Sequence, residues 1–217
     1  AHILGDLLEH TKSVVYCLVR CANAQKGLSR LKANMEQFGI WHPKYARRIV
    51  CLPGDLSKEY LGLDPQTYHA TARQVDAVIH NGAIVNFSYS YELLKEANVT
   101  GTLEVLKFTA REKIKPLYYV STIGVFETLT PLDKGKVGDD HPLPEPEALY
   151  YGYSRSKWVA EKLVGAFRAQ GMPVTIFRPG PIYGNTLSGA MNTDDFFCHM
   201  IRSCVRIGAV PELEVQV

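Results

Sequence analysis

The sequence predicts an α/β fold with a doubly wound, mostly parallel sheet and helices on both faces. Short apolar runs alternate with longer segments of helical periodicity along the whole chain, which is typical of βαβ units. The runs are almost continuously apolar, as expected of strands buried on both faces. Polar and glycine residues follow most of these runs, and such sheets bind ligands at the carboxyl ends of their strands.

Composition narrows the class of protein. The 217 residues are 46% hydrophobic and 21% charged, which suits a single globular domain, and the net charge of +2 indicates neither a nucleic-acid nor a membrane partner. No stretch approaches about 18 apolar residues and no charged leader precedes an apolar run, so neither a membrane span nor a signal peptide is expected. Five cysteines without a Cys-x-x-Cys pair favour a reduced, cytoplasmic compartment, and no metal site is expected.

The expected elements follow from periodicity. The first helix contains the apolar stripe from Ile3 to Leu8. Strands are predicted at 14–20, 47–52, 75–80, 116–122 and 173–178, and further helices at 28–38, 64–74, 91–111, 150–171 and 194–207. The segment 124–147 has no periodicity and is rich in glycine, proline and aspartate, so we expect a long surface loop near the site.

The segment 150–161 carries a tyrosine and a lysine on one helix face, because Tyr153 and Lys157 are four residues apart. An ammonium ~4 Å from a phenol favours phenolate by roughly 4 kcal/mol at an effective dielectric of ~20. We therefore expect Lys157 to lower the pKa of Tyr153 and to make it an acid catalyst. The alternative is an ordinary amphipathic helix with a solvated Lys157.

Several segments together carry a family resemblance. They are Cys17–Arg20, Gly54–Leu56, His80–Phe87, Asn98–Thr102, Val120–Thr122, Gly152–Glu161 and Arg178–Gly180. The chain resembles an extended short-chain dehydrogenase/reductase (SDR), and within that group the thioester reductase domain that ends many nonribosomal peptide and polyketide synthases. Aminoadipate and carboxylic acid reductases have a similar terminal domain. The resemblance implies a Rossmann-type domain over 1–217, with the substrate-binding portion beginning at 181–217.

The resemblance also implies a Thr-Tyr-Lys catalytic set, which maps onto Thr122, Tyr153 and Lys157. Thr122 would hydrogen-bond the thioester carbonyl oxygen, Tyr153 would donate a proton or hydrogen bond to it, and Lys157 would lower the phenol pKa and contact the nicotinamide ribose. Ser121 is the competitor for the threonine role. Alternatively, both hydroxyls only cap the strand end.

NADPH is the expected cofactor, because Arg20 ends the strand where a dinucleotide-binding fold selects its ribose and a basic residue there favours a 2′-phosphate. Arg30 either assists or is a surface arginine. Asp55 either lies near the adenine or only forms a turn, and Asn98 is either a site residue or a polar residue on a helix face. The residues expected to bind the cofactor are Arg20, Arg30, Asp55, Leu56, Asn81, Gly82, Ala83, Asn98, Ser121, Tyr153, Lys157, Arg178, Pro179 and Gly180.

The activity implied is reductive release of an acyl or peptidyl thioester from a phosphopantetheine-bearing carrier protein, giving an aldehyde or, after a second reduction, an alcohol. The domain would then be part of a larger synthase. One rival is an NAD-dependent nucleotide-sugar epimerase or dehydratase of the same group, against which Arg20 counts. A second rival is a redox-inactive relative, either a cyclase or a module that only binds a carrier domain. The glycine-rich turn of the family, which cradles the pyrophosphate, is expected immediately before Ala1.

Overall fold

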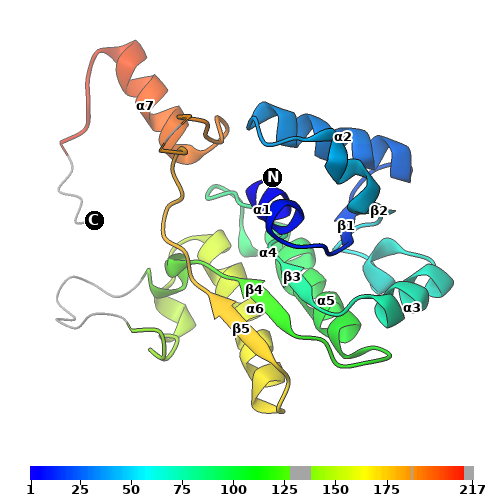
Figure 1. Cartoon of the computed structure of the whole chain (residues 1–217). Coiled ribbons are helices and arrows are strands. Elements are labelled where there is room, and N and C mark those ends of the chain that lie inside the picture. Colours follow the sequence, from blue (N-terminus) through cyan, green and yellow to red (C-terminus); the bar gives the residue numbers. More distant parts are fainter. Residues whose placement is uncertain (128–137, 187, 213–217) are drawn as a thin grey trace. The chain divides into compact units, whose positions relative to one another are not determined.

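The computed structural model describes residues 1–127, 138–186 and 188–212 (Figure 1). The chain divides into two compact units, Ala1–Gly180 and Pro181–Val217. The division falls where the substrate-binding portion is predicted to begin. Of the helices described, none has both the length and the apolar character needed to cross a membrane.

The first unit contains two parallel sheets. One pairs β1 (Val15–Val19) with β2 (Ile49–Pro53), and the other has the order β3-β4-β5 from β3 (Val78–His80), β4 (Leu117–Val120) and β5 (Val174–Phe177). In the doubly wound order 3-2-1-4-5-6, these sheets supply positions 3-2 and 4-5-6. No strand in the described part of the chain takes position 1, so the switch point lies between β1 and β3.

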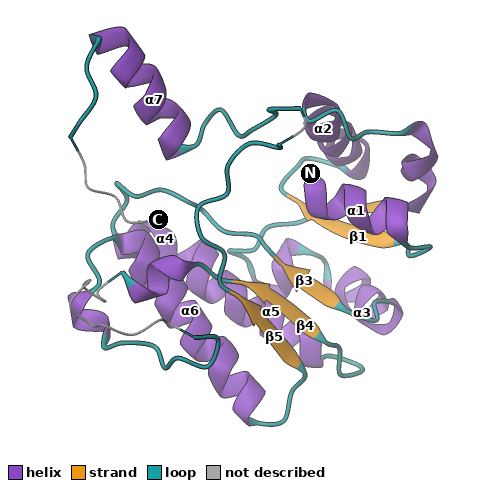
Figure 2. Ribbon diagram, turned by 60° about the vertical axis from the view of Figure 1, so that its left-hand side comes forward, coloured by secondary structure: helices purple, strands orange, loops and turns teal. Residues whose placement is uncertain are grey.

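The larger core lies against one face of the β3-β4-β5 sheet. Helices α5 (Gly101–Ala110) and α6 (Gly152–Ala169) lie along this face (Figure 2), and α3 (Pro65–Gln74) adds Tyr68 and Ala72 to the same cluster. Leu117 and Tyr119 point into it because alternate residues of a strand face one side. Their neighbour Tyr118, with Ile79 and Phe177, is exposed on the other face.

A smaller core holds the β1-β2 sheet to α1 (His2–His10) and α2 (Ala24–Gln37). Leu8, Met35, Tyr45 and Ile49 are its buried members. Tyr45 belongs to the 3₁₀ helix Pro43–Arg48, which takes up Arg47 and Arg48 and delays the second strand until Ile49. The prediction of a strand from residue 47 was therefore early by two residues. All five cysteines are free thiols.

The helix predicted at 91–111 is not continuous. It is divided into α4 (Tyr91–Lys95), a π-helical turn Glu96–Thr100 and α5.

The predicted loop at 124–147 begins with the 3₁₀ helix Ile123–Phe126 and ends with another at Pro146–Ala148, while its residues 128–137 lie outside the described part. A further short 3₁₀ segment, Glu59–Gly62, precedes α3. Asp64 caps α3 as predicted, by accepting a hydrogen bond from the Thr67 amide at 2.9 Å.

The second unit contains α7 (Phe196–Ile207). Asp195 caps this helix by accepting a hydrogen bond from the Phe197 amide, one residue after the expected acidic start at Asp194. Gly208 ends it in the left-handed conformation, with φ of 71°. The ring of Tyr183 packs edge-to-face on Phe197 at 5.1 Å, which ties the preceding segment to the helix.

Candidate active site

The carboxyl ends of β1 and β2 open into a cavity of about 830 Å³. The predicted site residues that line it are Arg20, Arg30, Asp55, Leu56, Gly82 and Ala83. They come from four separate stretches of sequence, and the fold brings them together because parallel strands end at the same edge of a sheet. Asn34, Gln37 and Glu96 also line the cavity, although no motif in the sequence singles them out.

The two arginines of this cavity are linked at the end of β1. Arg30 comes from α2, and its Nη1 donates a hydrogen bond to the Arg20 carbonyl oxygen at 3.1 Å. Both residues are exposed, so their charges face the solvent and the cavity. Asp55 accepts hydrogen bonds from the amide and the hydroxyl of Ser57, which lower its pKa and keep it a carboxylate. Because the two arginines line it, the cavity can take a ligand with an anionic end.

A second group of predicted residues lies where β4 meets α6. Lys157 is 4% exposed; its Nζ donates to the Val120 carbonyl oxygen at 2.8 Å and lies 4.4 Å from the centre of the Tyr119 ring. Tyr153 precedes it by one turn and is 9% exposed. Thr122 accepts a hydrogen bond from the Gly124 amide at 3.1 Å, which orients its hydroxyl and leaves the proton free to be donated.

The expected lowering of the Tyr153 pKa is not what the structure shows. Burial raises the pKa of Tyr153, and burial also lowers the pKa of Lys157 to about 8, against the opposing effect of Glu161. Both shifts have the same physical cause, since a dry environment disfavours the charged form of either group. The ammonium of Lys157 is directed at the end of β4, and burial affects the pKa of Tyr153 more than this ammonium does.

Asn98 connects the two groups. Its side-chain amide clamps the backbone of Ile84, accepting from the amide at 2.8 Å and donating to the carbonyl oxygen at 3.0 Å. It also donates to Ser156 Oγ at 2.9 Å, and Ser156 donates to the Tyr153 carbonyl oxygen at 2.7 Å. Asn98 lies in the π-helical turn, a feature that is frequent at functional sites. It therefore couples the segment after β3 to the helix that carries Tyr153.

His80 ends β3 beside this network as a neutral imidazole. Thr102 donates its hydroxyl proton to the Asn98 carbonyl oxygen at 2.7 Å, so it accepts the proton of His80 Nε2 at 3.0 Å. Burial, with a smaller effect of Lys157, lowers the pKa of His80 to about 3. The imidazole is thus a fixed structural donor.

Aromatic rings lead from Tyr153 to the surface. Phe87 packs edge-to-face on Tyr153 at 5.4 Å and on Tyr151 at 5.6 Å, and Tyr151 packs on Tyr150, which is 80% exposed. Gly152 allows this arrangement, because a Cβ there would lie 2.4 Å from the Tyr89 carbonyl oxygen. The ring of Tyr153 is therefore covered by Phe87, and the aromatic contacts continue from there to the surface at Tyr150.

The remaining predicted residues have other surroundings. Arg178, predicted to bind the cofactor, donates from Nε and Nη2 to Glu161 Oε1 at 2.9 and 2.7 Å, and from Nη1 to the Asp139 carbonyl oxygen at 2.9 Å. Pro179 accepts a hydrogen bond from the Ile123 amide at 3.0 Å. Asn81 and Gly180 are exposed. Ser121 is buried, and its hydroxyl has no partner among the described residues, so the choice between Ser121 and Thr122 stays a prediction.

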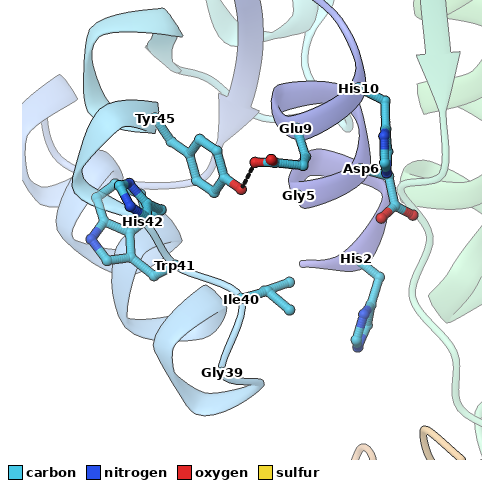
Figure 3. A pocket seen from close by; sticks show the side chains of 10 residues that line it. All are labelled: His2, Gly5, Asp6, Glu9, His10, Gly39, Ile40, Trp41, His42 and Tyr45. Atoms are coloured by element: carbon cyan, nitrogen blue, oxygen red, sulfur yellow. Dashed lines mark hydrogen bonds between the residues drawn. The ribbon is translucent and has the colours of Figure 1, made fainter. Parts of the chain in front are cut away.

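A separate cavity of about 350 Å³ lies between α1 and the segment 39–45 (Figure 3). Its carboxylate Glu9 is already engaged, since it accepts a hydrogen bond from the Tyr45 hydroxyl at 2.7 Å and pairs with Lys44 at 2.7 Å. It contains none of the predicted site residues. Within the described ranges, no three His, Cys, Asp or Glu side chains converge as a metal site.

The strand order, the cavity at the switch point and the tyrosine–lysine pair on α6 define the class: an extended SDR with a Rossmann-type fold. The chain belongs to the family described as Male sterility protein, whose NAD-binding model matches residues 1–217. Membership indicates a nicotinamide cofactor, and the predicted family resemblance and fold class are confirmed.

Two curated relatives of this chain are named as a peptide synthetase and a reductase. It is 38% identical over 221 residues to the non-canonical nonribosomal peptide synthetase FrzA of Cladobotryum sp, covering 100% of this chain and 22% of that protein. It is 36% identical over 222 residues to L-2-aminoadipate reductase of Schizosaccharomyces pombe, covering 97% of this chain and 16% of that one.

One solved structure is covered over a larger share of its length than these two relatives are. The terminal R domain from the myxalamid PKS-NRPS biosynthetic pathway superposes with a TM-score of 0.95 at 42% identity, over 99% of this chain and 54% of that chain. This chain therefore spans about half of that solved structure and less than a quarter of the two curated relatives.

Proposed function

We propose that the protein carries out NADPH-dependent reductive release of an acyl or peptidyl thioester from a carrier protein, with an aldehyde as the first product. The observation that carries this proposal is the placement of Thr122, Tyr153 and Lys157 where β4 meets α6. Relatives that are named as a peptide synthetase and an aminoadipate reductase support the substrate class. A carrier protein bearing phosphopantetheine is the proposed partner, within a larger synthase.

The cavity at the β1 end fits the adenosine portion of NADPH. Its volume and the glycine at position 82 suit a nucleotide, and two arginines that line it, with Arg30 bonded to the Arg20 carbonyl oxygen, suit a 2′-phosphate. Asp55 and Leu56 would lie along the adenine side, and Gly82 and Ala83 along the central portion. NADH has no phosphate at this position, so two exposed arginines at one strand end favour NADPH.

Bound NADPH would supply the hydride, and the side chains of this chain would handle the carbonyl oxygen. Thr122 would donate a hydrogen bond to that oxygen, and Tyr153 would donate its proton as negative charge develops there. Because burial keeps Tyr153 in the phenol form, it holds a proton at neutral pH. Lys157 would stabilise the phenolate that remains. The hemithioacetal would then break down to an aldehyde and the carrier thiol.

The aromatic rings beside Tyr153 support an apolar acyl group as the substrate. Phe87 and Tyr151 present exposed ring area next to the phenol, where a hydrocarbon chain would gain by leaving water. The thioester carbon would then lie at Tyr153, with its chain along these rings.

The test is NADPH oxidation by the full-length protein with a pantetheine acyl thioester. Tyr153→Phe should lower the rate by about 10²–10⁴-fold, the usual contribution of a general acid. Tyr118→Phe removes a hydroxyl on the other face of the β3-β4-β5 sheet and should keep the rate. Full activity of a folded Tyr153→Phe variant would contradict the role of Tyr153, and no NADPH oxidation by the wild type would contradict the function.

A further inference from the structure

Glu161 lies one helical turn beyond Lys157 on α6, and it was not among the predicted site residues. Its side chain is only 2% exposed, although a buried carboxylate is costly without partners. Oε1 accepts both hydrogen bonds from Arg178, whereas Oε2 is buried without a partner in the described part of the chain. One oxygen is therefore held by the Arg178 guanidinium in an ion pair, and the other is left without a hydrogen bond among the described residues.

The groups that face Lys157 come from three elements. Tyr153 and Glu161 share its helix, Tyr119 faces it from β4, and His80 faces it from β3. The Tyr119 hydroxyl is buried without a described partner, and burial and the nearby Glu161 raise its pKa, so this phenol is neutral. His80 is neutral as well. Glu161 is thus the anion, among the described neighbours, that favours the ammonium form of Lys157.

Arg178 holds Glu161 from outside this cluster. Its Nη1 donates to the Asp139 carbonyl oxygen at 2.9 Å, and its guanidinium carbon lies 5.0 Å from the centre of the Phe126 ring. The guanidinium is thus tied to the end of β5, to the segment before α6 and to the helix itself. These contacts fix the position of the carboxylate relative to Lys157.

We propose that Glu161 is a positioning residue that holds Lys157 in its charged form, and that Arg178 serves this site by orienting Glu161. The catalytic consequence depends on the proposed reduction, whereas the coupling between the two side chains does not. Without the carboxylate, the ammonium would keep one carbonyl oxygen and one aromatic ring as neighbours, in surroundings that favour its neutral form.

Glu161→Gln tests the coupling directly, because it removes the charge and leaves a carbonyl oxygen for Arg178. The pKa of Lys157 would be measured by NMR in the full-length protein labelled with ¹³C at lysine Cε, with the signal assigned by its loss in Lys157→Arg. It should fall by about one unit, as expected when an opposite charge is removed nearby. Glu104→Gln is the matched control, since Glu104 is also buried but bonds Tyr60 and Lys107.

Glu161→Asp keeps the charge on a shorter side chain and should lower the Lys157 pKa by less than Glu161→Gln does. An unchanged or raised Lys157 pKa in whichever of the two variants folds would overturn the inference. Loss of stability alone, as in Glu104→Gln, would likewise mark Glu161 as structural.

The catalytic readout is the pH profile of NADPH oxidation. The alkaline limb of kcat should move toward lower pH by the same amount as the Lys157 pKa, about one unit for Glu161→Gln. An alkaline limb that stays in place while the NMR pKa moves would restrict Glu161 to an electrostatic role without catalytic effect, and would overturn the positioning role. Absence of reduction in every variant, with the NMR shift present, would contradict the proposed function and leave the coupling intact.

Discussion

The β1–β2 end of the candidate site and its β4–α6 end hold their cations in opposite ways. Arg20 and Arg30 are exposed, and they are linked through a backbone carbonyl oxygen at the mouth of a large cavity. Lys157 is buried against the Tyr119 ring and the Val120 carbonyl oxygen, and Glu161 lies one helical turn beyond it. Water keeps the arginines charged at little cost, whereas burial lowers the pKa of Lys157 to about 8.

Because of this difference, we expect the two ends of the site to have different functions. Exposed guanidinium groups can recruit an anion and select between ligands, since a charge-assisted hydrogen bond retains useful strength at a surface. A desolvated ammonium interacts strongly with its few neighbours, so small changes around Lys157 should alter how readily Tyr153 gives up its proton. Affinity is therefore expected to depend on the first end and reactivity on the second.

Arg20→Ala should have the largest effect of the changes that test this comparison. If Arg20 contacts a 2′-phosphate, the Kd for NADPH should rise about 10–100-fold and the Kd for NADH should hardly change, because one charge-assisted hydrogen bond is lost. Fluorescence titration of both cofactors with the full-length protein measures this. Arg47→Ala, an exposed arginine outside the cavity, is the control. Equal weakening of both cofactors would show that Arg20 contacts a group they share.

Replacement of the buried lysines should separate a functional charge from a structural one. Lys115 is also buried, but it donates to the carbonyl oxygens of Phe108, Arg111 and Lys113 after α5. Lys115→Met should therefore lower the free energy of unfolding by roughly 2–3 kcal/mol. Lys157→Met should raise it by about 1 kcal/mol at pH 7, because burial disfavours the ammonium more than Glu161 favours it.

The pH dependence gives the sign of the Lys157 effect. Its pKa is lowered from 10.5 to about 8 in the folded protein, so the cost of the buried ammonium is complete below pH 8. The unfolded chain binds more protons between these two values, so wild-type stability gains relative to Lys157→Met as pH rises. Urea denaturation of the wild type and of Lys157→Met between pH 8 and 10.5 measures this difference in the free energy of unfolding. A destabilised Lys157→Met at every pH would show that Lys157 is mainly a packing residue.

Phe87→Ala should have the smallest effect. Loss of the ring next to Tyr153 should raise KM for a long apolar acyl thioester about 3–10-fold, the usual worth of one aromatic contact, while an acetyl thioester is unaffected. Steady-state kinetics with the two substrates measures the difference. Tyr89→Ala removes a neighbouring exposed ring and is the control. The same change for both substrates would argue against an acyl-chain site at Phe87.

Local patterns predicted most of the framework. The apolar run 173–178 contains β5 at Val174–Phe177, and Asp64-Pro65 begins α3 as expected, because strand burial and helix capping depend on residues close in sequence. The helix at 91–111 was predicted as continuous, yet it contains a π-helical turn at Asn98. The contacts of that side chain with Ile84 and Ser156 join segments that no periodicity connects.

Helix Gly152–Ala169 shows where sequence and tertiary structure divide. The four-residue spacing of Tyr153 and Lys157 determined that both lie on one helix face, and the residues after the apolar runs determined which groups gather at the sheet edge. The tertiary structure decided that Arg178 bonds Glu161, that Lys157 donates to the Val120 carbonyl oxygen, and that burial raises the Tyr153 pKa. Desolvation and long-range pairing depend on every segment packed around a group, so a local sequence pattern cannot predict them.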